Sequence, residues 1–180
     1  MRIISGKHQR RKINPPKNLP VRPTTDFAKE ALFNILNNKY STFENLTVLD
    51  LFSGTGSISL EFASRGAKSV MSIDSNSNCI NFIKKTAEEL DLPIETEVID
   101  AIQYSNSNKI AYDIVFADPP YTIGDDDLIL LHQLVTENLL VENGLFILEH
   151  SKHALKDIDL PSEIDRRKYG ATVFRWINKE

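Results

Sequence analysis

Apolar and polar residues alternate along the chain with a period that changes several times after residue 26. Ala28, Leu32 and Leu36 recur at helical spacing, which predicts a helix that begins at Asp26. Short apolar runs then alternate with amphipathic stretches. This alternation predicts strands at 47–51, 69–73, 94–99, 113–117 and 145–149 and helices at 57–64, 76–90 and 125–140. Strands and helices in this order are typical of right-handed βαβ units in a parallel sheet.

The last part of the chain departs from this alternation. Residues 163–169 and 171–178 alternate polar and apolar side chains around Gly170, which predicts an antiparallel hairpin at one edge of the sheet. The stretch at 103–109 is too short and too polar to assign to a helix. We therefore expect an α/β fold, with a mostly parallel sheet and an antiparallel C-terminal hairpin.

Composition narrows the class of protein. The chain has 180 residues, of which 41% are hydrophobic, and this is enough to bury the core of one domain. No apolar run approaches the roughly 20 residues that a membrane-spanning helix requires, and the first residues lack the apolar stretch of a signal peptide. The single cysteine, Cys79, excludes a disulfide framework and a multi-cysteine metal site. We expect a cytoplasmic monomer that binds no metal and no membrane.

The charge of the chain is unevenly distributed. The net charge of −4 comes from 21 basic and 25 acidic residues, yet residues 1–25 contain no acidic residue. This segment predicts an extended basic arm, with a short strand at 2–5, in front of a single domain at 26–180. Such asymmetry indicates an anionic partner, although many charge runs are only solvated tails. The residues expected to contact that partner are Arg2, Lys7, Arg10, Arg11, Lys12 and Arg22.

The first predicted strand runs into a turn that contains Gly54 and Gly56. Ligands of open parallel sheets bind at the carboxyl ends of strands, and paired glycines let the backbone approach a ligand closely before a helix. Asp50 precedes this turn, and its carboxylate would repel the pyrophosphate of a dinucleotide. Ser59 also stands where the dinucleotide fingerprint requires glycine or alanine. The pattern favours a cationic ligand, and S-adenosylmethionine, with its ammonium and sulfonium groups, fits better than NAD.

Two further acids follow the next two predicted strands. Asp74 can accept hydrogen bonds from two ribose hydroxyls, and Asp100 can meet the amino group of adenine. Each acid alone is equally compatible with a solvated turn or a helix cap, but three acids at three consecutive strand ends favour a cofactor site. The expected cofactor-binding residues are Asp50, Ser53, Gly54, Gly56, Asp74 and Asp100.

The predicted strand at 113–117 ends in the segment Asp118-Pro119-Pro120-Tyr121. Two prolines cannot continue a central strand, so the chain leaves the sheet in a stiff turn. Such a turn suits a flat substrate with an amino group, because Asp118 and the Pro119 carbonyl can accept its N–H groups while Tyr121 stacks on its ring. A purely structural proline turn is the alternative. The expected catalytic residues are Asp118, Pro119 and Tyr121.

These motifs resemble those of the amino-methyltransferases with a D/N-P-P-Y signature, and the whole chain resembles the RsmD family of bacterial ribosomal RNA methyltransferases. The Arg-Pro-Thr block is the most specific part of the resemblance. The matching segments are RIISGK at 2–7, RPTTD at 22–26, KEALFN at 29–34, LDLFSGTG at 49–56, SRGA at 64–67, DPPY at 118–121 and YG at 169–170.

The resemblance implies a Rossmann-like S-adenosylmethionine-dependent methyltransferase fold. It also implies methyl transfer to N2 of a guanine in 16S ribosomal RNA on assembled small-subunit particles, with the basic arm in contact with the RNA. Arg22, Thr24 and Thr25 are then expected to pack over the cofactor, with Thr25 among the cofactor-binding residues. Two positions depart from the family pattern, because Arg10 replaces an expected glycine and Asp74 replaces the usual glutamate.

Other functions share parts of this pattern. The same chemistry can methylate adenine N6 in DNA or another RNA, or a glutamine amide in a protein. DNA enzymes usually carry a further recognition domain, and the glutamine-modifying relatives favour asparagine where this chain has Asp118. A ribosome-assembly factor that binds RNA without catalysis and a dehydrogenase are two further alternatives, but the complete set of acids and the Asp-Pro-Pro-Tyr segment disfavour both.

Overall fold

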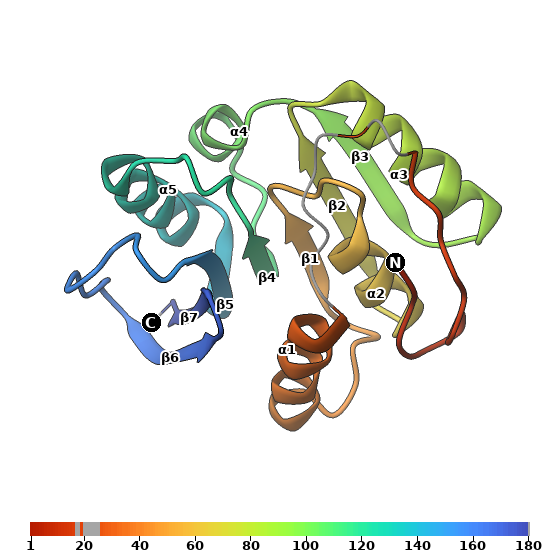
Figure 1. Cartoon of the computed structure of the whole chain (residues 1–180), viewed down its shortest axis with the longest axis horizontal. Coiled ribbons are helices and arrows are strands. Elements are labelled where there is room, and N and C mark those ends of the chain that lie inside the picture. Colours follow the sequence, from red (N-terminus) through yellow and green to blue (C-terminus); the bar gives the residue numbers. More distant parts are fainter. Residues whose placement is uncertain (17–18, 20–25, 180) are drawn as a thin grey trace.

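The computed structural model describes residues 1–16, 19 and 26–179, and a seven-stranded sheet with the order β3-β2-β1-β4-β5-β7-β6 forms its centre (Figure 1). Strands β1 to β5 run parallel, whereas β7 and β6 add an antiparallel hairpin at one edge, as predicted. The strands are β1 (Thr47–Asp50), β2 (Ser69–Asp74), β3 (Ile94–Val98), β4 (Tyr112–Ala117), β5 (Leu140–Ser151), β6 (Glu163–Tyr169) and β7 (Thr172–Asn178). The helices are α1 (Asp26–Lys39), α2 (Ser57–Ser64), α3 (Ser77–Glu89), α4 (Ala101–Ser107) and α5 (Asp125–Asn138).

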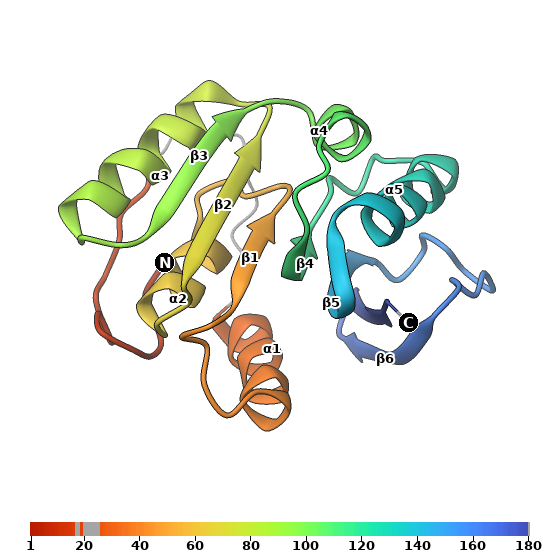
Figure 2. The ribbon, with the colours of Figure 1, turned by 180° about the vertical axis from the view of Figure 1, so that it is seen from behind.

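Helices cover both faces of the sheet. On one face α1 and α2 meet through Phe33 and Phe62, whose ring centroids lie 4.7 Å apart, and Leu60 of α2 packs with Leu90 at the end of α3. On the other face α4 and α5 pack beside β4 and β5 (Figure 2). The chain therefore turns to opposite faces after the adjacent strands β1 and β4. This divergence opens a crevice at the carboxyl edge of the sheet, where ligands of such folds bind.

Most predicted elements are confirmed to within two residues, and the two larger differences have physical causes. The fifth strand begins at Leu140 rather than at 145, because its first part continues the pairing with Tyr112 across a register shift. Helix α4 forms in a stretch whose polar composition predicts no helix. Its start is capped by the Asp100 carboxylate, which accepts the Gln103 N–H at 2.9 Å, and its Tyr104 is buried in the core.

Residues 1–13, called the N-terminal turn below, fold against the helices instead of forming an extended arm. Ile3 and Ile13 are buried with Leu60 and Leu90 in a small apolar cluster. The predicted strand at 2–5 is reduced to one antiparallel bridge, between Arg2 and Lys12. The prediction of an extended segment is therefore wrong for these residues, because isolated isoleucines in a polar stretch are enough to dock it.

A buried carboxylate anchors the N-terminal turn to α2. Glu61 is fully buried and accepts the backbone N–H groups of Ile4 at 2.7 Å and Ser5 at 3.0 Å. The same carboxylate pairs with Arg65 at 2.7 Å and with Lys29 at 3.6 Å. Two cations and two backbone donors thus compensate one buried acid, as such a charge requires.

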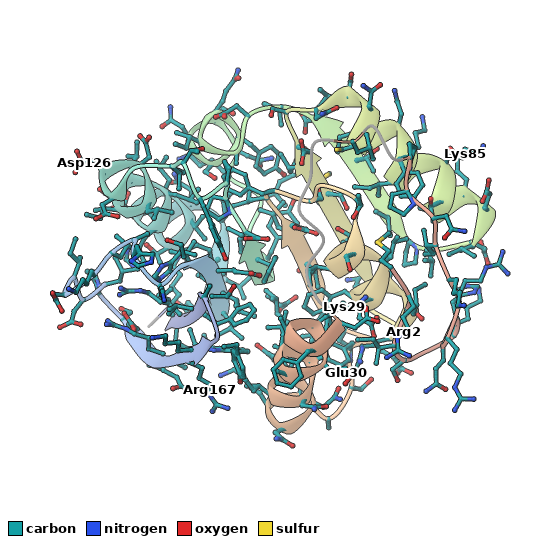
Figure 3. The ribbon with its side chains drawn as sticks, in the orientation of Figure 1. Arg2, Lys29, Glu30, Lys85, Asp126 and Arg167 are labelled. Atoms are coloured by element: carbon teal, nitrogen blue, oxygen red, sulfur yellow. The ribbon has the colours of Figure 1, made fainter. Side chains whose placement is uncertain are left out.

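Lys29 connects three parts of the chain. Its Nζ donates to the Arg2 carbonyl at 2.6 Å and to Oγ of Ser57, the first residue of α2, at 3.2 Å. Figure 3 shows Arg2, Lys29 and Glu30 close together where α1 meets the N-terminal turn. Burial lowers the pKa of Lys29, and the neighbouring Glu61 opposes that shift. The start of α2 is therefore held from α1 and from the N-terminal turn.

Two features are absent from the described residues. No helix in this part of the chain is long and apolar enough to cross a membrane. The same residues contain no group of three or more His, Cys, Asp or Glu side chains placed to hold a metal ion.

We expect Glu61→Gln to destabilise the fold by about 3 kcal/mol, because it leaves buried cations without their counter-charge. Urea unfolding followed by circular dichroism measures this loss. Glu89→Gln is the matched control, since Glu89 and its partner Lys85 form an exposed pair at 3.9 Å. Such pairs contribute at most about 1 kcal/mol. Equal losses in the two variants would show that the buried cluster does not stabilise the fold.

Candidate active site

A cleft of about 580 Å³ opens at the carboxyl edge of the sheet, beside the ends of β1, β2 and β4. This volume lies within the usual range for small-molecule and cofactor sites. A smaller cavity of about 30 Å³ lies next to it, and Phe52, Gly54 and Asp118 border both. The residues that line the larger cleft are Phe52, Gly54, Asp74, Ser75, Asn76, Asp100, Asp118, Pro119, Pro120 and Tyr121.

The glycine turn after β1 is held from β2 and α3. The Asp74 carboxylate accepts the N–H of Gly54 at 2.8 Å through Oδ2 and that of Asn76 at 2.8 Å through Oδ1. Gly56 precedes α2 with φ of +74°, in the left-handed region, and a Cβ there would lie 2.7 Å from a side-chain carbon of Ile83. Both the conformation and the close approach require glycine at this position.

Asp50 is a buried acid that is only partly compensated. Its Oδ2 accepts the Ser59 hydroxyl at 2.6 Å, and Ser72 in turn donates to Ser59 at 2.8 Å. Its Oδ1 has no hydrogen-bond partner among the described residues. Burial raises the pKa of Asp50 to about 7; the Ser59 hydrogen bond opposes this shift, and the charges of Asp74 and Asp118 add to it. Asp50 is one of the residues that line the small cavity.

The donor set of the small cavity fits the amino-acid end of S-adenosylmethionine. An ammonium group there would pair with the open Asp50 oxygen, and a carboxylate would meet the amino end of α2, where backbone N–H groups favour an anion. Ser53 also borders this cavity, and its own hydroxyl donates to the Ile73 carbonyl at 2.6 Å. A neutral or anionic ligand would leave the buried acid without a counter-charge.

The larger cleft brings the remaining acids to one surface. Asp100 lines the cleft, and its Oδ1 also caps α4. The sequence left a cofactor site and a helix cap as alternatives for this residue, and the structure shows the cap at the edge of the cleft. Asp74 lines it while both its oxygens accept backbone N–H groups. A carboxylate has about four acceptor positions, so these contacts leave room for ribose or adenine donors.

The Asp-Pro-Pro-Tyr segment forms the opposite wall of the cleft. It follows β4 directly, and its turn is closed by the Ile123 N–H, which donates to the Pro120 carbonyl at 2.9 Å. Tyr121 is 40% exposed, and its hydroxyl lies 2.9 Å from Oγ1 of Thr172 at the start of β7. The aromatic ring is thus tethered to the C-terminal hairpin while it lines the cleft.

The structure adds residues that the sequence patterns do not identify. The sequence marks Ser59 only as a missing glycine, whereas its hydroxyl donates to Asp50. Thr172 holds Tyr121, but no local motif distinguishes it. Glu149 is 2% exposed near the carboxyl end of β5, and it follows Leu148, which pairs in register with Ala117 at the end of β4. An acid within an apolar strand is the signal that could have revealed it.

None of the basic residues of the N-terminal turn lines this cleft. The Lys7 N–H donates to the carbonyl of Ser64, the last residue of α2, and its Nζ pairs with Asp91 beyond the end of α3. Both helices start at the cleft, so Lys7 lies near their far ends (Figure 1). Arg2 lies closer to the start of α2, because its carbonyl and Oγ of Ser57 both accept from Lys29. Three expected site residues, Arg22, Thr24 and Thr25, lie outside the described residues.

Comparisons with known proteins agree with the geometry. The family model described as conserved hypothetical protein 95 matches residues 1–178. The ribosomal RNA small subunit methyltransferase D of Buchnera aphidicola is 33% identical over 166 residues, 90% of this chain and 82% of that protein. The solved structure of yhhF from Escherichia coli has a TM-score of 0.84 at 25% identity and covers 100% of this chain and 98% of that one.

A more distant neighbour shows the fold with its cofactor. The RsmC methyltransferase of Thermus thermophilus, solved with S-adenosylmethionine and guanosine, has a TM-score of 0.69 at 18% identity over 87% of this chain and 44% of that one. Fold and site together define the class of S-adenosylmethionine-dependent methyltransferases with a Rossmann-like sheet. Within that class, the chain belongs to the RsmD family.

We expect the affinity for S-adenosylmethionine to rise with pH up to about 7. Below its raised pKa of about 7 the free Asp50 carboxyl is mostly protonated, whereas the bound ammonium favours the ionised form. Binding at about pH 6 therefore releases a proton, which calorimetry in two buffers of different ionisation enthalpy detects.

Asp50→Asn is the control for this experiment. It should bind more weakly and release no proton, and any pH dependence that remains in this variant belongs to the amino group of the cofactor. Equal affinities of the wild-type protein at about pH 6 and about pH 7.5 would contradict a titrating Asp50 at the ammonium site.

Proposed function

We propose that this protein transfers the methyl group of S-adenosylmethionine to N2 of a guanine in 16S ribosomal RNA, in the cytoplasm and on assembled small-subunit particles. The observation that carries the proposal is a cleft that brings Asp74 and Asp100 to the Asp-Pro-Pro-Tyr wall, with Asp50 in the small cavity next to it. Relatives named ribosomal RNA small subunit methyltransferase D, 33% identical in Buchnera aphidicola, support the substrate class.

The chemistry proposed for the cleft depends mainly on positioning. The cofactor supplies an electrophilic methyl group on its sulfonium. Asp118 and the Pro119 carbonyl accept the two N–H groups of the target amine, which aims its nitrogen at the methyl carbon, and Tyr121 stacks on the base. As the N–C bond forms and the C–S bond breaks, Asp118 stabilises the positive charge that develops on nitrogen. The proton of that nitrogen then leaves to water. A base inside a helix is turned out of its stack for such a reaction.

The acid at this wall favours guanine over adenine. Guanine presents two adjacent donors, N1–H and the N2 amino group, whereas N1 of adenine is an acceptor. Asp118 lines the cleft. Its carboxylate has two acceptor oxygens, which complement adjacent donors, and a carboxylate opposite adenine N1 would repel its lone pair.

We propose that the N-terminal turn contacts RNA outside the cleft, with Arg22 joining it. Arg2 already pairs with Asp26 at 2.8 Å, and Lys7 pairs with Asp91 at 3.1 Å. Arg10, Arg11 and Lys12 are exposed and form no ion pair within the described part of the chain. These three residues can therefore bind phosphates without first breaking an ion pair, unlike Arg2 and Lys7. Arg10 also adopts φ of +67°, which explains why glycine suits this position of the turn.

Labelled S-adenosylmethionine tests the proposed substrate. The protein is incubated with small subunits from a strain that lacks this gene, with free 16S RNA, with DNA and with total protein. Label on N2 of guanine in the small subunit supports the proposal. Label on adenine, DNA or glutamine would replace it with one of the alternative methyltransferases, and label on none of them, together with RNA binding, would indicate a binding protein without catalysis.

We expect Asp118→Ala to lower the turnover of labelled methyl groups by about 100-fold or more, because charge on the amine is no longer stabilised. Binding of S-adenosylmethionine, measured by calorimetry, should survive. Asp126→Ala is the matched control, since Asp126 is an exposed acid on the first turn of α5, away from the cleft (Figure 3). Near-normal turnover of the Asp118 variant would exclude the proposed mechanism.

We expect the triple change Arg10→Ala, Arg11→Ala and Lys12→Ala to flatten the dependence of RNA affinity on salt. Every phosphate that the variant no longer neutralises reduces the slope of log affinity against log salt by about 0.7–0.9. Filter binding at several salt concentrations measures it. Lys109→Ala, at an exposed lysine between α4 and β4, serves as the control. An unchanged slope in the triple variant would show that the N-terminal turn does not contact RNA.

A further inference from the structure

An exposed phenylalanine stands at the start of α1. Phe27 is 70% exposed, although it is a large apolar side chain in an ordered helix. Its ring packs edge-on against Tyr169, with 6.3 Å between the centroids and 76° between the planes. Tyr169 in turn packs against the buried Phe174 at 5.8 Å. Tyr169 thus contacts the core, and the Phe27 ring is exposed to solvent.

This aromatic pair lies at the substrate end of the cleft. Tyr169 and Thr172 pair across the turn between β6 and β7, and Thr172 also pairs with Ser151 at the carboxyl end of β5. The turn therefore belongs to the same edge of the sheet as the cleft. Thr172 holds the hydroxyl of Tyr121, the ring proposed to stack on the target base. Only the short hairpin turn separates Tyr121 from the Phe27–Tyr169 pair.

Charged residues of both signs lie around the pair, and one of them is a partly exposed arginine. Arg167 pairs in register with Phe174, so it shares the face of the hairpin that bears Tyr169, and Figure 3 shows it between β6 and α1. Its side chain is 46% exposed and forms an ion pair with Asp165 at 2.6 Å. The acid beside Phe27, Asp26, is itself neutralised by Arg2 at 2.8 Å.

We propose that Phe27, supported by Tyr169, stacks on an unpaired nucleotide of the RNA next to the target guanine, with Arg167 near its phosphate. The inference rests on the proposed function, because it places the flanking nucleotide beside a base held at Tyr121. Aromatic side chains with a neighbouring cation are a recurrent way to bind single-stranded RNA without reading its sequence. Such a contact would compensate part of the stacking that the neighbours lose when the guanine is turned out.

Methyl transfer to small subunits from a strain that lacks this gene tests the inference in the full-length protein. Phe27→Ala should raise the KM for these particles at least about fivefold, while kcat and the affinity for S-adenosylmethionine stay unchanged. Phe27→Trp should restore the wild-type KM, because the indole stacks, and Phe27→Leu should not. Ile110→Ala is the matched control, since Ile110 is 61% exposed before β4 at the opposite edge of the sheet; it should change nothing.

The outcomes separate this inference from the proposed function. If the wild-type protein methylates guanine in the particles and Phe27→Ala has an unchanged KM, the inference is overturned and the function stands. If Phe27→Leu performs as well as Phe27→Trp, apolar area rather than stacking is responsible and the inference is also overturned. If the wild-type protein labels no RNA, the proposed function fails and the inference fails with it.

Discussion

The parallel pairing of β1 with β4 is the constraint on which the site depends. Leu49 and Val115 lie in register, so the two chains leave the sheet side by side. One then turns to α2 and the other, through two prolines, to α5 on the opposite face. That divergence opens the crevice into which Asp50 and Asp118 both face, although they are far apart in the sequence. The walls proposed for the cofactor and for the substrate both result from this one strand order.

Two buried acids on the same face of the molecule show how this protein separates stability from function. Glu61 has two cations and two backbone donors around it, and it fastens the N-terminal turn and α1 to α2. Asp50 accepts from one serine and has an open oxygen, and burial raises its pKa to about 7. Glu61, whose charge is fully compensated, stabilises the fold. The charge of Asp50 is only partly compensated, and a cationic ligand would supply the missing counter-charge.

The sequence was sufficient for the fold because its strands and helices differ clearly in hydrophobic period, and the acids at strand ends identified the cleft. It was insufficient where contacts between distant segments determine the structure. In the sequence Glu61 is one polar residue of a predicted helix, and only the packed structure shows that it is buried. Ile3 and Ile13 are too few to form a periodic pattern, so the N-terminal turn was expected to be extended. Thr172 matters only through Tyr121, a contact between segments that no local pattern records.

The hydrogen bond between Tyr121 and Thr172 also has a consequence for biosynthesis. The residues proposed to hold the cofactor precede residue 101, whereas the tether of the Tyr121 ring comes from β7, the last strand of the sheet. A ribosome that makes this chain from its amino end therefore releases the cofactor half of the cleft well before the strand that fixes the substrate ring. β7 also lies between β5 and β6, so its arrival completes the sheet and the substrate wall in one event. A nascent chain of this protein therefore lacks the tether of Tyr121, the ring proposed to stack on the base, until its synthesis is almost finished.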